Sequence, residues 1–277
     1  MRGRFRSSFL AILLTIATAS ALALPTASNV PGGIARIVLG TVLDTPEPPR
    51  AWLGEQPVWI ARDNGHWIAI VGVPLDTPVG TKTLRVATNM GERSVDFPVA
   101  AKRYAEQHVR LKDSSKVTLL PDDEKRALAE IERIQALKRH WREAEDTDSS
   151  FARPADGRLS SRFGLRRIFN GEPRAPHSGL DIAVPRGAPI VAAAEGRVLA
   201  VDDYFFNGKT VFLDHGNGLL SMYCHLDRID VKPGDPLRKG QRLGLAGATG
   251  RASGPHLHWS VVLNGTMVDP ELFLQHR

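Results

Sequence analysis

Two short motifs in the C-terminal half of the chain combine histidine with carboxylate. One reads His177-Ser-Gly-Leu-Asp181 and the other reads His256-Leu-His258. Two imidazoles and one carboxylate suit a catalytic zinc ion, because three protein ligands leave the fourth tetrahedral position open for water. A further histidine beyond that ligand count could then transfer protons. These residue types therefore indicate a metal-dependent hydrolytic site.

A fifth candidate side chain is His225, which follows the apolar run at residues 219–224. Five of the nine histidines fall between positions 177 and 258, and this clustering favours an enzyme. The neighbouring Cys224 raises the alternative of a Cys/His nucleophile pair. We disfavour that alternative because adjacent residues of a strand point to opposite faces, so Cys224 would face away from the groups that His225 serves.

Short elements must position these side chains. Residues 256–264 have strand composition, which places His256 and His258 on one face of the strand. Gly179 and Pro185 disfavour a helix after His177, so a loop that enters a strand at 180–184 fits better. Taken alone, each motif also fits half-exposed strand histidines or a solvated loop.

The region 151–277 predicts one compact domain of strands and long loops. Short apolar runs, such as 196–201 and 219–223, alternate with glycine-containing turns, and no long helical pattern competes with them. His215 lies in the tight turn Asp-His-Gly-Asn-Gly, and we assign it a structural role.

Residues 30–101 predict a small immunoglobulin-like β-sandwich. The runs at 58–71 and 81–99 each contain a turn sequence, Asp-Asn-Gly and Asn-Met-Gly respectively. His66 lies within a predicted strand among aromatic residues and is expected to pack or to face solvent.

The segment 102–150 reads as a connector that contains an amphipathic helix at about 122–145. Pro121 and Asp122 supply an N-terminal start signal. Apolar residues then recur at spacings of three and four and form one stripe, which should pack on a neighbouring domain: Leu128, Ile131, Ile134, Leu137 and Trp141.

The N-terminus has the pattern of a secretory signal peptide, assigned to residues 1–23. Arginines at positions 2, 4 and 6 precede a short apolar run, and small-residue cleavage patterns end at Ala21 and Ala23. The run is too short to predict a membrane span in the mature protein. Removing the three arginines lowers the formal charge from +6 to +3, which gives little support to a nucleic-acid partner.

The expected location is the periplasm or the exterior of the cell envelope. Cys224 is the single cysteine, so an exported chain of this sequence has no internal disulfide. Its cores, and a metal ion, must then hold the fold.

The order of the motifs is more specific than any one of them. His-x3-Asp at 177–181 precedes Gly-Asn-Gly at 216–218, Tyr-x-His-Leu at 223–226 and Gly-Pro-His-Leu-His at 254–258. In this order, over about residues 156–272, the chain resembles the M23 family of zinc metallopeptidases, the lysostaphin- and LytM-like peptidoglycan endopeptidases. The resemblance implies a mainly β catalytic domain over 151–277, with an antiparallel sheet or sandwich.

By this resemblance, His177, Asp181 and His258 are the ligands of one zinc ion per chain, and His225 and His256 are catalytic histidines. The implied substrate is a peptide stem or cross-link of bacterial peptidoglycan, and the implied process is cell-wall remodelling. The N-terminal region resembles the accessory region of envelope proteins of this family, so an envelope protein is a candidate partner.

Three further hypotheses accompany this resemblance. Asn170 could cap the metal in a latent form, as it does in some relatives. A non-catalytic envelope binding module or amidase activator could use the same fold, although such proteins typically lack ligands that are all present here. A lipoyl- or biotinyl-like carrier is suggested by residues 231–240, but no lysine lies at a suitable hairpin tip there.

Overall fold

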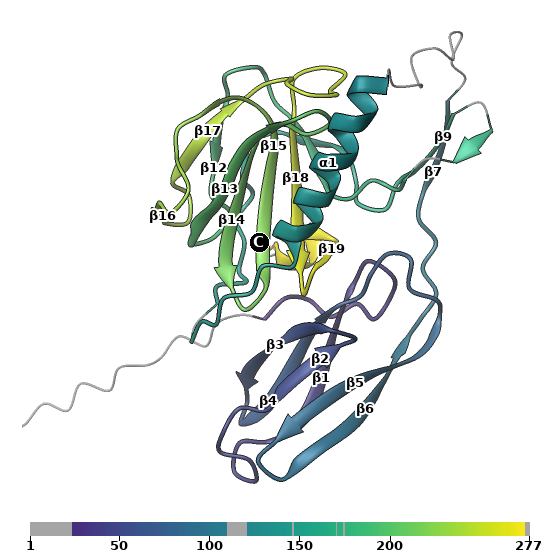
Figure 1. The fold of residues 1–277 in the computed structure, drawn as a ribbon, viewed down its shortest axis with the longest axis vertical. Helices are drawn as coiled ribbons and strands as arrows, with labels where there is room; N and C mark the ends of the chain where they lie inside the picture. Colours follow the sequence, from purple (N-terminus) through teal and green to yellow (C-terminus); the bar gives the residue numbers. More distant parts are fainter. Residues whose placement is uncertain (1–23, 110–120, 146, 170, 174, 275–277) are drawn as a thin grey trace, which may run out of the picture.

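The computed structural model describes residues 24–109, 121–145, 147–169, 171–173 and 175–274. Within these ranges the chain is mainly β, with two large antiparallel sheets and one α-helix, so the predicted fold class is confirmed (Figure 1). None of the helices in the described ranges is long and apolar enough to cross a membrane. The predicted signal peptide, residues 1–23, lies outside the described residues.

The N-terminal sheet has six strands in the order β1-β4-β3-β2-β5-β6. Strand β3 pairs with β2 through its first residues and with β4 through its last, so the sheet curls around a core of small and branched apolar side chains. Both turn sequences predicted here connect strand pairs, β3 to β4 and β5 to β6. The strands are β1 (Ile34–Thr41), β2 (Arg50–Leu53), β3 (Gln56–Asp63), β4 (His66–Gly72), β5 (Gly80–Thr88) and β6 (Gly91–Val99).

The C-terminal sheet follows the order β16-β13-β14-β15-β18-β11-β8, with β12, β17 and β19 paired at its sides. Its central strands β14, β15 and β18 are almost entirely buried because they are covered on both faces. The strands are β8 (Arg158–Ser161), β11 (Leu180–Ala183), β12 (Pro189–Val191), β13 (Gly196–Tyr204), β14 (Gly208–Gly216), β15 (Leu219–Ile229), β16 (Pro236–Leu237), β17 (Arg242–Ala246), β18 (Leu257–Leu263) and β19 (Thr266–Val268), and a 3-10 turn, η2, covers Pro270–Phe273.

A third, small sheet was not predicted from the sequence. It contains β7 (Glu106–Val109), β9 (Arg166–Phe169) and β10 (Glu172–Pro173), and β7 runs parallel to β9. Strand β7 lies in the segment 102–150, for which the sequence predicts a connector with one helix. Its partner lies about 60 residues away along the chain, and such pairing leaves no local pattern for sequence reasoning to detect.

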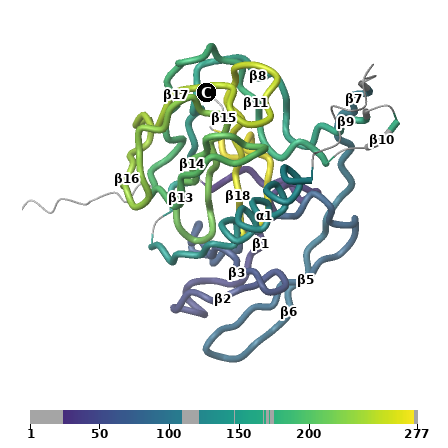
Figure 2. Tube along the Cα trace, turned by 45° about the horizontal axis from the view of Figure 1, so that its top comes forward, coloured from purple at the N-terminus to yellow at the C-terminus, as the bar shows by residue number. Residues whose placement is uncertain are grey.

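Helix α1 (Pro121–Lys138) is shorter than the predicted 122–145. It lies along the sheet at β13 (Figure 2). Beyond Lys138 the chain leaves helical geometry, and Arg142 pairs with Asp214 while its carbonyl accepts a hydrogen bond from Asn217. These long-range contacts replace the last predicted turns.

The predicted apolar stripe of this helix is only partly correct. Ile134 and Leu137 pack on the sheet beside the buried Ala127, whereas Leu128 and Ile131 are 57% and 42% exposed. Trp141 lies beyond the end of the helix. The packed face is therefore rotated from the predicted stripe, and Glu130 and Arg133 hold it there through contacts with the amide of Phe205 and with Asp202.

The two large sheets share one core. Ile34, Trp59 and Ile70 of the N-terminal sheet belong to the same buried cluster as Leu263 and Val268 of the C-terminal sheet. This continuous core fixes the N-terminal sheet against the sheet that carries the predicted site.

Candidate metal centre

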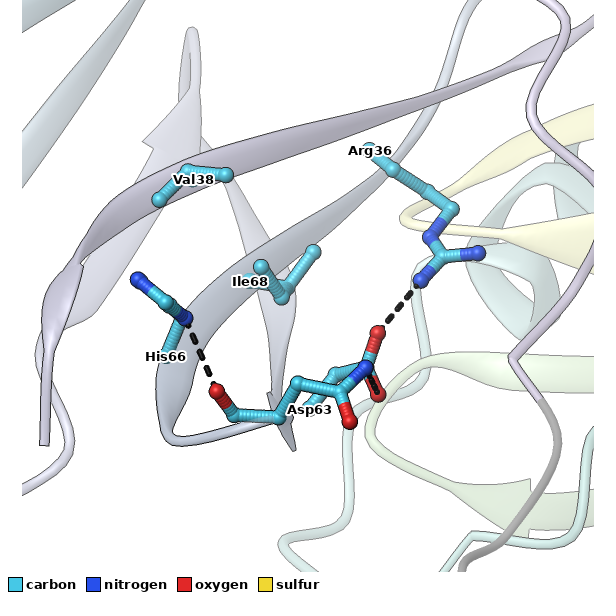
Figure 3. A pocket seen from close by; sticks show the side chains of 6 residues that line it. Arg36, Val38, Asp63, His66 and Ile68 are labelled. Carbon is cyan, nitrogen blue, oxygen red and sulfur yellow. Dashed lines mark hydrogen bonds and ion pairs between the residues drawn. The ribbon is translucent and has the colours of Figure 1, made fainter.

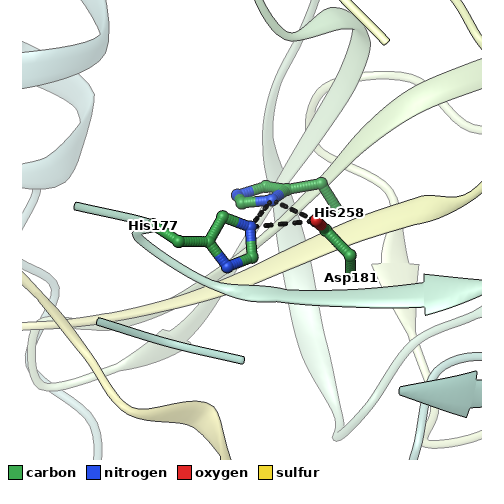
Figure 4. A group of neighbouring side chains, drawn as sticks. All are labelled: His177, Asp181 and His258. Carbon is green, nitrogen blue, oxygen red and sulfur yellow. Dashed lines mark hydrogen bonds and ion pairs between the residues drawn. The ribbon is translucent and has the colours of Figure 1, made fainter. Parts of the chain in front are cut away.

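The structure brings His177, Asp181 and His258 together (Figure 4). Asp181 in β11 lies directly opposite His258 in β18, and His177 comes from the loop that precedes β11. His177 Nε2 and His258 Nδ1 each lie 2.9 Å from Asp181 Oδ1, and the two nitrogens are 3.0 Å apart. Three potential ligand atoms therefore converge at one point.

The outer nitrogens of the two histidine rings are held by other groups. His177 Nδ1 donates to the carbonyl oxygen of Arg162 at 2.9 Å, and Ser161 Oγ is 3.3 Å from the same nitrogen. His258 Nε2 lies 2.9 Å from Ser260 Oγ. Such outer partners fix the orientation and tautomer of metal-binding histidines.

The donor set fits a cation. Because a carbonyl can only accept, His177 carries its proton on Nδ1, and Nε2 of the neutral ring presents a lone pair. That lone pair faces the Asp181 carboxylate and His258 Nδ1. Converging lone pairs repel one another unless a positive charge lies among them, and three donor atoms this close together can bind one metal ion.

The electrostatics of the site favour deprotonated ligands. Burial alone would raise the pKa of the Asp181 carboxyl, but the adjacent rings of His177 and His258 outweigh it and hold that pKa well below its usual range. Burial lowers the pKa of His258, so its ring stays neutral. An ionised carboxylate with neutral imidazoles is the protonation state that binds a metal.

His225 and His256 lie beside the three convergent residues. Their ring centroids are 4.7 Å apart, and His256 Nε2 is 3.7 Å from Asp181 Oδ1. His225 Nδ1 donates to the carbonyl of Thr249, and His256 Nδ1 donates to the carbonyl of Gly254, each at 2.8 Å. With the proton on Nδ1, Nε2 of each ring is the nitrogen that can present a lone pair, and burial lowers the pKa of His225 to about 4.

The structure corrects the argument about Cys224 but keeps its outcome. Strand β15 has a register shift against β14 between Tyr223 and Leu226, and His225 has a positive φ of 62°. Strict alternation of faces therefore fails at this point. Cys224 is nonetheless buried in a separate apolar cluster, and burial raises the pKa of its thiol to about 12.

The two histidines given structural roles lie apart from this group. His215 is buried, with Nδ1 donating to the carbonyl of Glu195 at 2.6 Å and Nε2 at 2.8 Å from Ser221 Oγ. His66 is exposed at the start of β4 and lines a shallow depression of the N-terminal sheet (Figure 3). The depression contains none of the five predicted site residues; its lining is Arg36, Val38, Asp63, Asn64, His66 and Ile68. Asn170 lies outside the described residues.

The sequence did not predict the groups that hydrogen-bond to the outer nitrogens of the site histidines. Four of them are Ser260 and the backbone carbonyls of Arg162, Thr249 and Gly254. The run Ser-Ser-Arg-Phe-Gly at 160–164, which contains Arg162, also resembles the segment ahead of the first ligand in M23 proteins, and it is the one sequence signal for any of these four groups.

Fold and site together define a mainly β protein with a candidate His-Asp-His metal centre and two adjacent imidazoles. Residues 175–270 match the family described as Peptidase family M23, and residues 27–102 match Peptidase family M23 N-terminal domain. A crystal structure titled as a putative peptidase M23 from Pseudomonas aeruginosa aligns with a TM-score of 0.75 and 43% identity, covering 89% of this chain and 95% of that one. The chain belongs to peptidase family M23.

Curated relatives match over a shorter stretch. The peptidoglycan DD-endopeptidase ShyA of Vibrio cholerae is 41% identical over 113 residues, which is 40% of this chain and 26% of that protein. The DD-carboxypeptidase/endopeptidase Mpg of Neisseria meningitidis is 36% identical over 113 residues, covering 41% of this chain and 26% of that protein. The match thus spans about a quarter of the length of these relatives.

Proposed function

We propose that this protein is a zinc-dependent metalloendopeptidase that hydrolyses peptide cross-links or stems of peptidoglycan in cell-wall remodelling. The observation that carries the proposal is the convergence of His177, Asp181 and His258. Beside them lie the imidazoles of His225 and His256, whose Nδ1 atoms are hydrogen-bonded to backbone carbonyls. Such an arrangement supplies three ligands and two imidazoles that can transfer protons during amide hydrolysis.

The roles divide by geometry. His177, Asp181 and His258 hold the ion, which when bound polarises the substrate carbonyl and lowers the pKa of a coordinated water. His256 accepts a proton from the attacking water at Nε2, the nitrogen that points toward the ligand group. His225 or His256 then donates a proton to the leaving amine. A protonated ring at either position also stabilises the developing oxyanion.

The relatives and the N-terminus support the proposed substrate class and location. Proteins named peptidoglycan DD-endopeptidases support peptidoglycan peptide as the substrate. Export through the signal peptide at residues 1–23 would place the mature protein in the periplasm or at the exterior of the envelope. The N-terminal sheet is then available to an envelope protein partner.

The test compares wild type with His177→Ala and His256→Ala in zinc content and in muropeptide release from purified peptidoglycan. His177→Ala should lose zinc and activity together, because two ligands rarely retain the ion. His256→Ala should keep zinc and lose about 100-fold or more in activity. Loss of zinc in His256→Ala would mean that its role and that of a ligand are exchanged.

A second outcome distinguishes the enzyme from a binding module. A zinc-loaded wild type that releases no muropeptides, with no difference between the variants, would favour a non-catalytic envelope binding module. The complete set of ligands and proton carriers does not favour that alternative.

A further inference from the structure

The loop at residues 161–165 holds His177 through several hydrogen bonds. Gly164 N–H donates to the carbonyl of His177 at 2.8 Å, and His177 N–H donates to the carbonyl of Leu165 at 3.0 Å. The carbonyl of Arg162 in the same loop accepts from His177 Nδ1 at 2.9 Å. The position of this loop therefore sets both the backbone and the ring of the first candidate ligand.

Tyr104 covers this loop. A Cβ atom added at Gly164 would lie 2.0 Å from Cδ1 of Tyr104, so the tyrosine ring packs directly on the glycine backbone. The ring also meets the buried Phe163 edge-on, with centroids 6.1 Å apart. Next to it, Arg166 N–H donates to the carbonyl of Ala105 at 2.9 Å, and β7 then continues the pairing with β9.

The other end of Tyr104 is tied to the N-terminal domain. Its hydroxyl donates to the carbonyl of Pro31 at 2.7 Å. Burial raises the pKa of the Tyr104 phenol to about 12, so the hydroxyl stays protonated and keeps this bond. A Cβ atom added at Gly32 would lie 2.5 Å from Phe163 Cε1 and 2.9 Å from the Tyr104 hydroxyl, which shows how closely the two domains approach here.

We propose that Tyr104 is a positioning residue that clamps the loop 161–165 between the N-terminal domain and His177, and thereby sets the affinity of the site for zinc. This inference rests on the proposed role of His177 as a ligand. The N-terminal domain thus takes part in building the metal centre, in addition to any partner that it binds. Loss of partners that orient a metal ligand typically weakens metal binding by about 10- to 100-fold.

The experiment uses the mature chain and three variants. Tyr104→Ala removes the ring and the hydroxyl, and Tyr104→Phe removes the hydroxyl alone. Trp67→Ala is the control, because Trp67 is another partly buried aromatic residue of the N-terminal domain with one hydrogen bond, from Nε1 to the carbonyl of Thr45, on a different element. Zinc affinity is measured by competition with a chelator.

Tyr104→Ala should bind zinc about 10- to 100-fold more weakly than wild type. Trp67→Ala should stay within about 3-fold of wild type, and Tyr104→Phe, which keeps the ring but loses the bond to Pro31, should lie between wild type and Tyr104→Ala. Excess zinc should restore the peptidase activity of Tyr104→Ala, because the chemical groups are intact. Zinc affinity of Tyr104→Ala equal to that of wild type, whatever its stability, overturns the proposal.

A second measurement keeps the two proposals separate. Hydrogen exchange of the Gly164 and His177 amides in zinc-free protein should accelerate in Tyr104→Ala and stay unchanged in Trp67→Ala, because the loop loses its cover. A wild type that binds no zinc refutes the proposed function, and unchanged exchange refutes the clamp. If Tyr104→Ala fails to fold, Tyr104→Leu replaces it: the shorter side chain removes the ring from Gly164, so zinc affinity and amide exchange should change in the same direction.

Discussion

At the scale of single residues, three of the four candidate histidines share one kind of contact, because their Nδ1 atoms donate to backbone carbonyls. His225 and His256 each donate a hydrogen bond from Nδ1 to a backbone carbonyl, so Nε2 is the ring nitrogen that can accept a proton. In His177 the same arrangement makes Nε2 the potential metal ligand. The same type of hydrogen bond thus prepares His177 to bind a metal and His256 to accept a proton. The two differ in the distance from Nε2 to Asp181 Oδ1, which is 2.9 Å for His177 and 3.7 Å for His256.

Cys224 provides a prediction at this scale. Cys224→Ala should keep zinc, and its kcat/KM should stay within about 3-fold of wild type, because the buried thiol, with a pKa of about 12, is neither ionised nor part of the site. The native protein should also resist alkylation by iodoacetamide. A 100-fold loss of activity in Cys224→Ala with zinc retained would support a cysteine nucleophile.

At the scale of elements, the bulge in β15 determines where His225 lies. The register of β15 against β14 shifts between Tyr223 and Leu226, and the backbone of His225 takes a positive φ that few residues other than glycine adopt. The loop at Thr249 fixes the ring, and that loop packs on the turn before β14 at Gly208.

Gly208→Ala should disturb His225 through Thr249. Gly208 has φ +60°, and a Cβ atom there would lie 2.4 Å from the Thr249 carbonyl carbon, whose oxygen accepts from His225. We expect kcat to fall by about 10-fold or more while zinc content is preserved. Gly234→Ala is the matched control, since Gly234 also has a positive φ but nothing lies within 4 Å of its added Cβ. Equal activity of the two variants would contradict this coupling.

Buried His215 in β14 should make the stability of the protein depend on pH. Burial lowers the pKa of His215 from 6.5 to about 4 in the folded protein. Between pH 6.5 and pH 4 the unfolded chain binds a proton at His215 more strongly than the folded chain does. The contribution of the neutral ring to the stability of the folded state is therefore fully present above pH 6.5 and is lost as the pH falls toward 4. Its size is at most about 3 kcal/mol.

The measurement is denaturant unfolding of zinc-free protein at pH 7 and pH 4.5. His215→Gln should lower stability at pH 7 and should depend less on pH than wild type. His66→Gln is the control because His66 is exposed. If the His215→Gln variant depends on pH as strongly as wild type, His215 does not contribute to the acid sensitivity.

At the scale of the whole molecule, the two sheets are joined by polar as well as apolar contacts. Buried Asn264, at the end of β18, accepts from the Gly72 amide at 2.6 Å and donates to the Gly72 carbonyl at 3.2 Å. Together with the shared core, this pairing predicts that the two domains unfold in one cooperative transition.

Asn264→Gly should lower the free energy of unfolding by about 1–3 kcal/mol, because two buried backbone groups of Gly72 lose their partners. Glycine tolerates the positive φ of 39° at this position, so the substitution adds no backbone strain. Asn64→Gly is the control, since Asn64 has φ 47° in an exposed turn, and its change should be within about 0.5 kcal/mol. Two separate unfolding transitions in wild type would contradict the prediction that the two domains unfold together.

The amino-acid sequence by itself determined the residue types of the site and its local geometry. His-x3-Asp before a strand and His-Leu-His at the start of another strand can be read from spacing, because side chains alternate along a strand. The order of these motifs indicated the family that the comparisons show, and the strand and turn pattern predicted a mainly β chain.

The tertiary structure decided which of these groups meet and what holds them. The register that sets Asp181 opposite His258 joins residues 77 positions apart, and the end of α1 at Lys138 depends on contacts with Asp214 and Asn217. The carbonyls that orient His177, His225 and His256 belong to the backbone, which every residue shares. Such partners have no signature in residue type, so only the folded chain selects them.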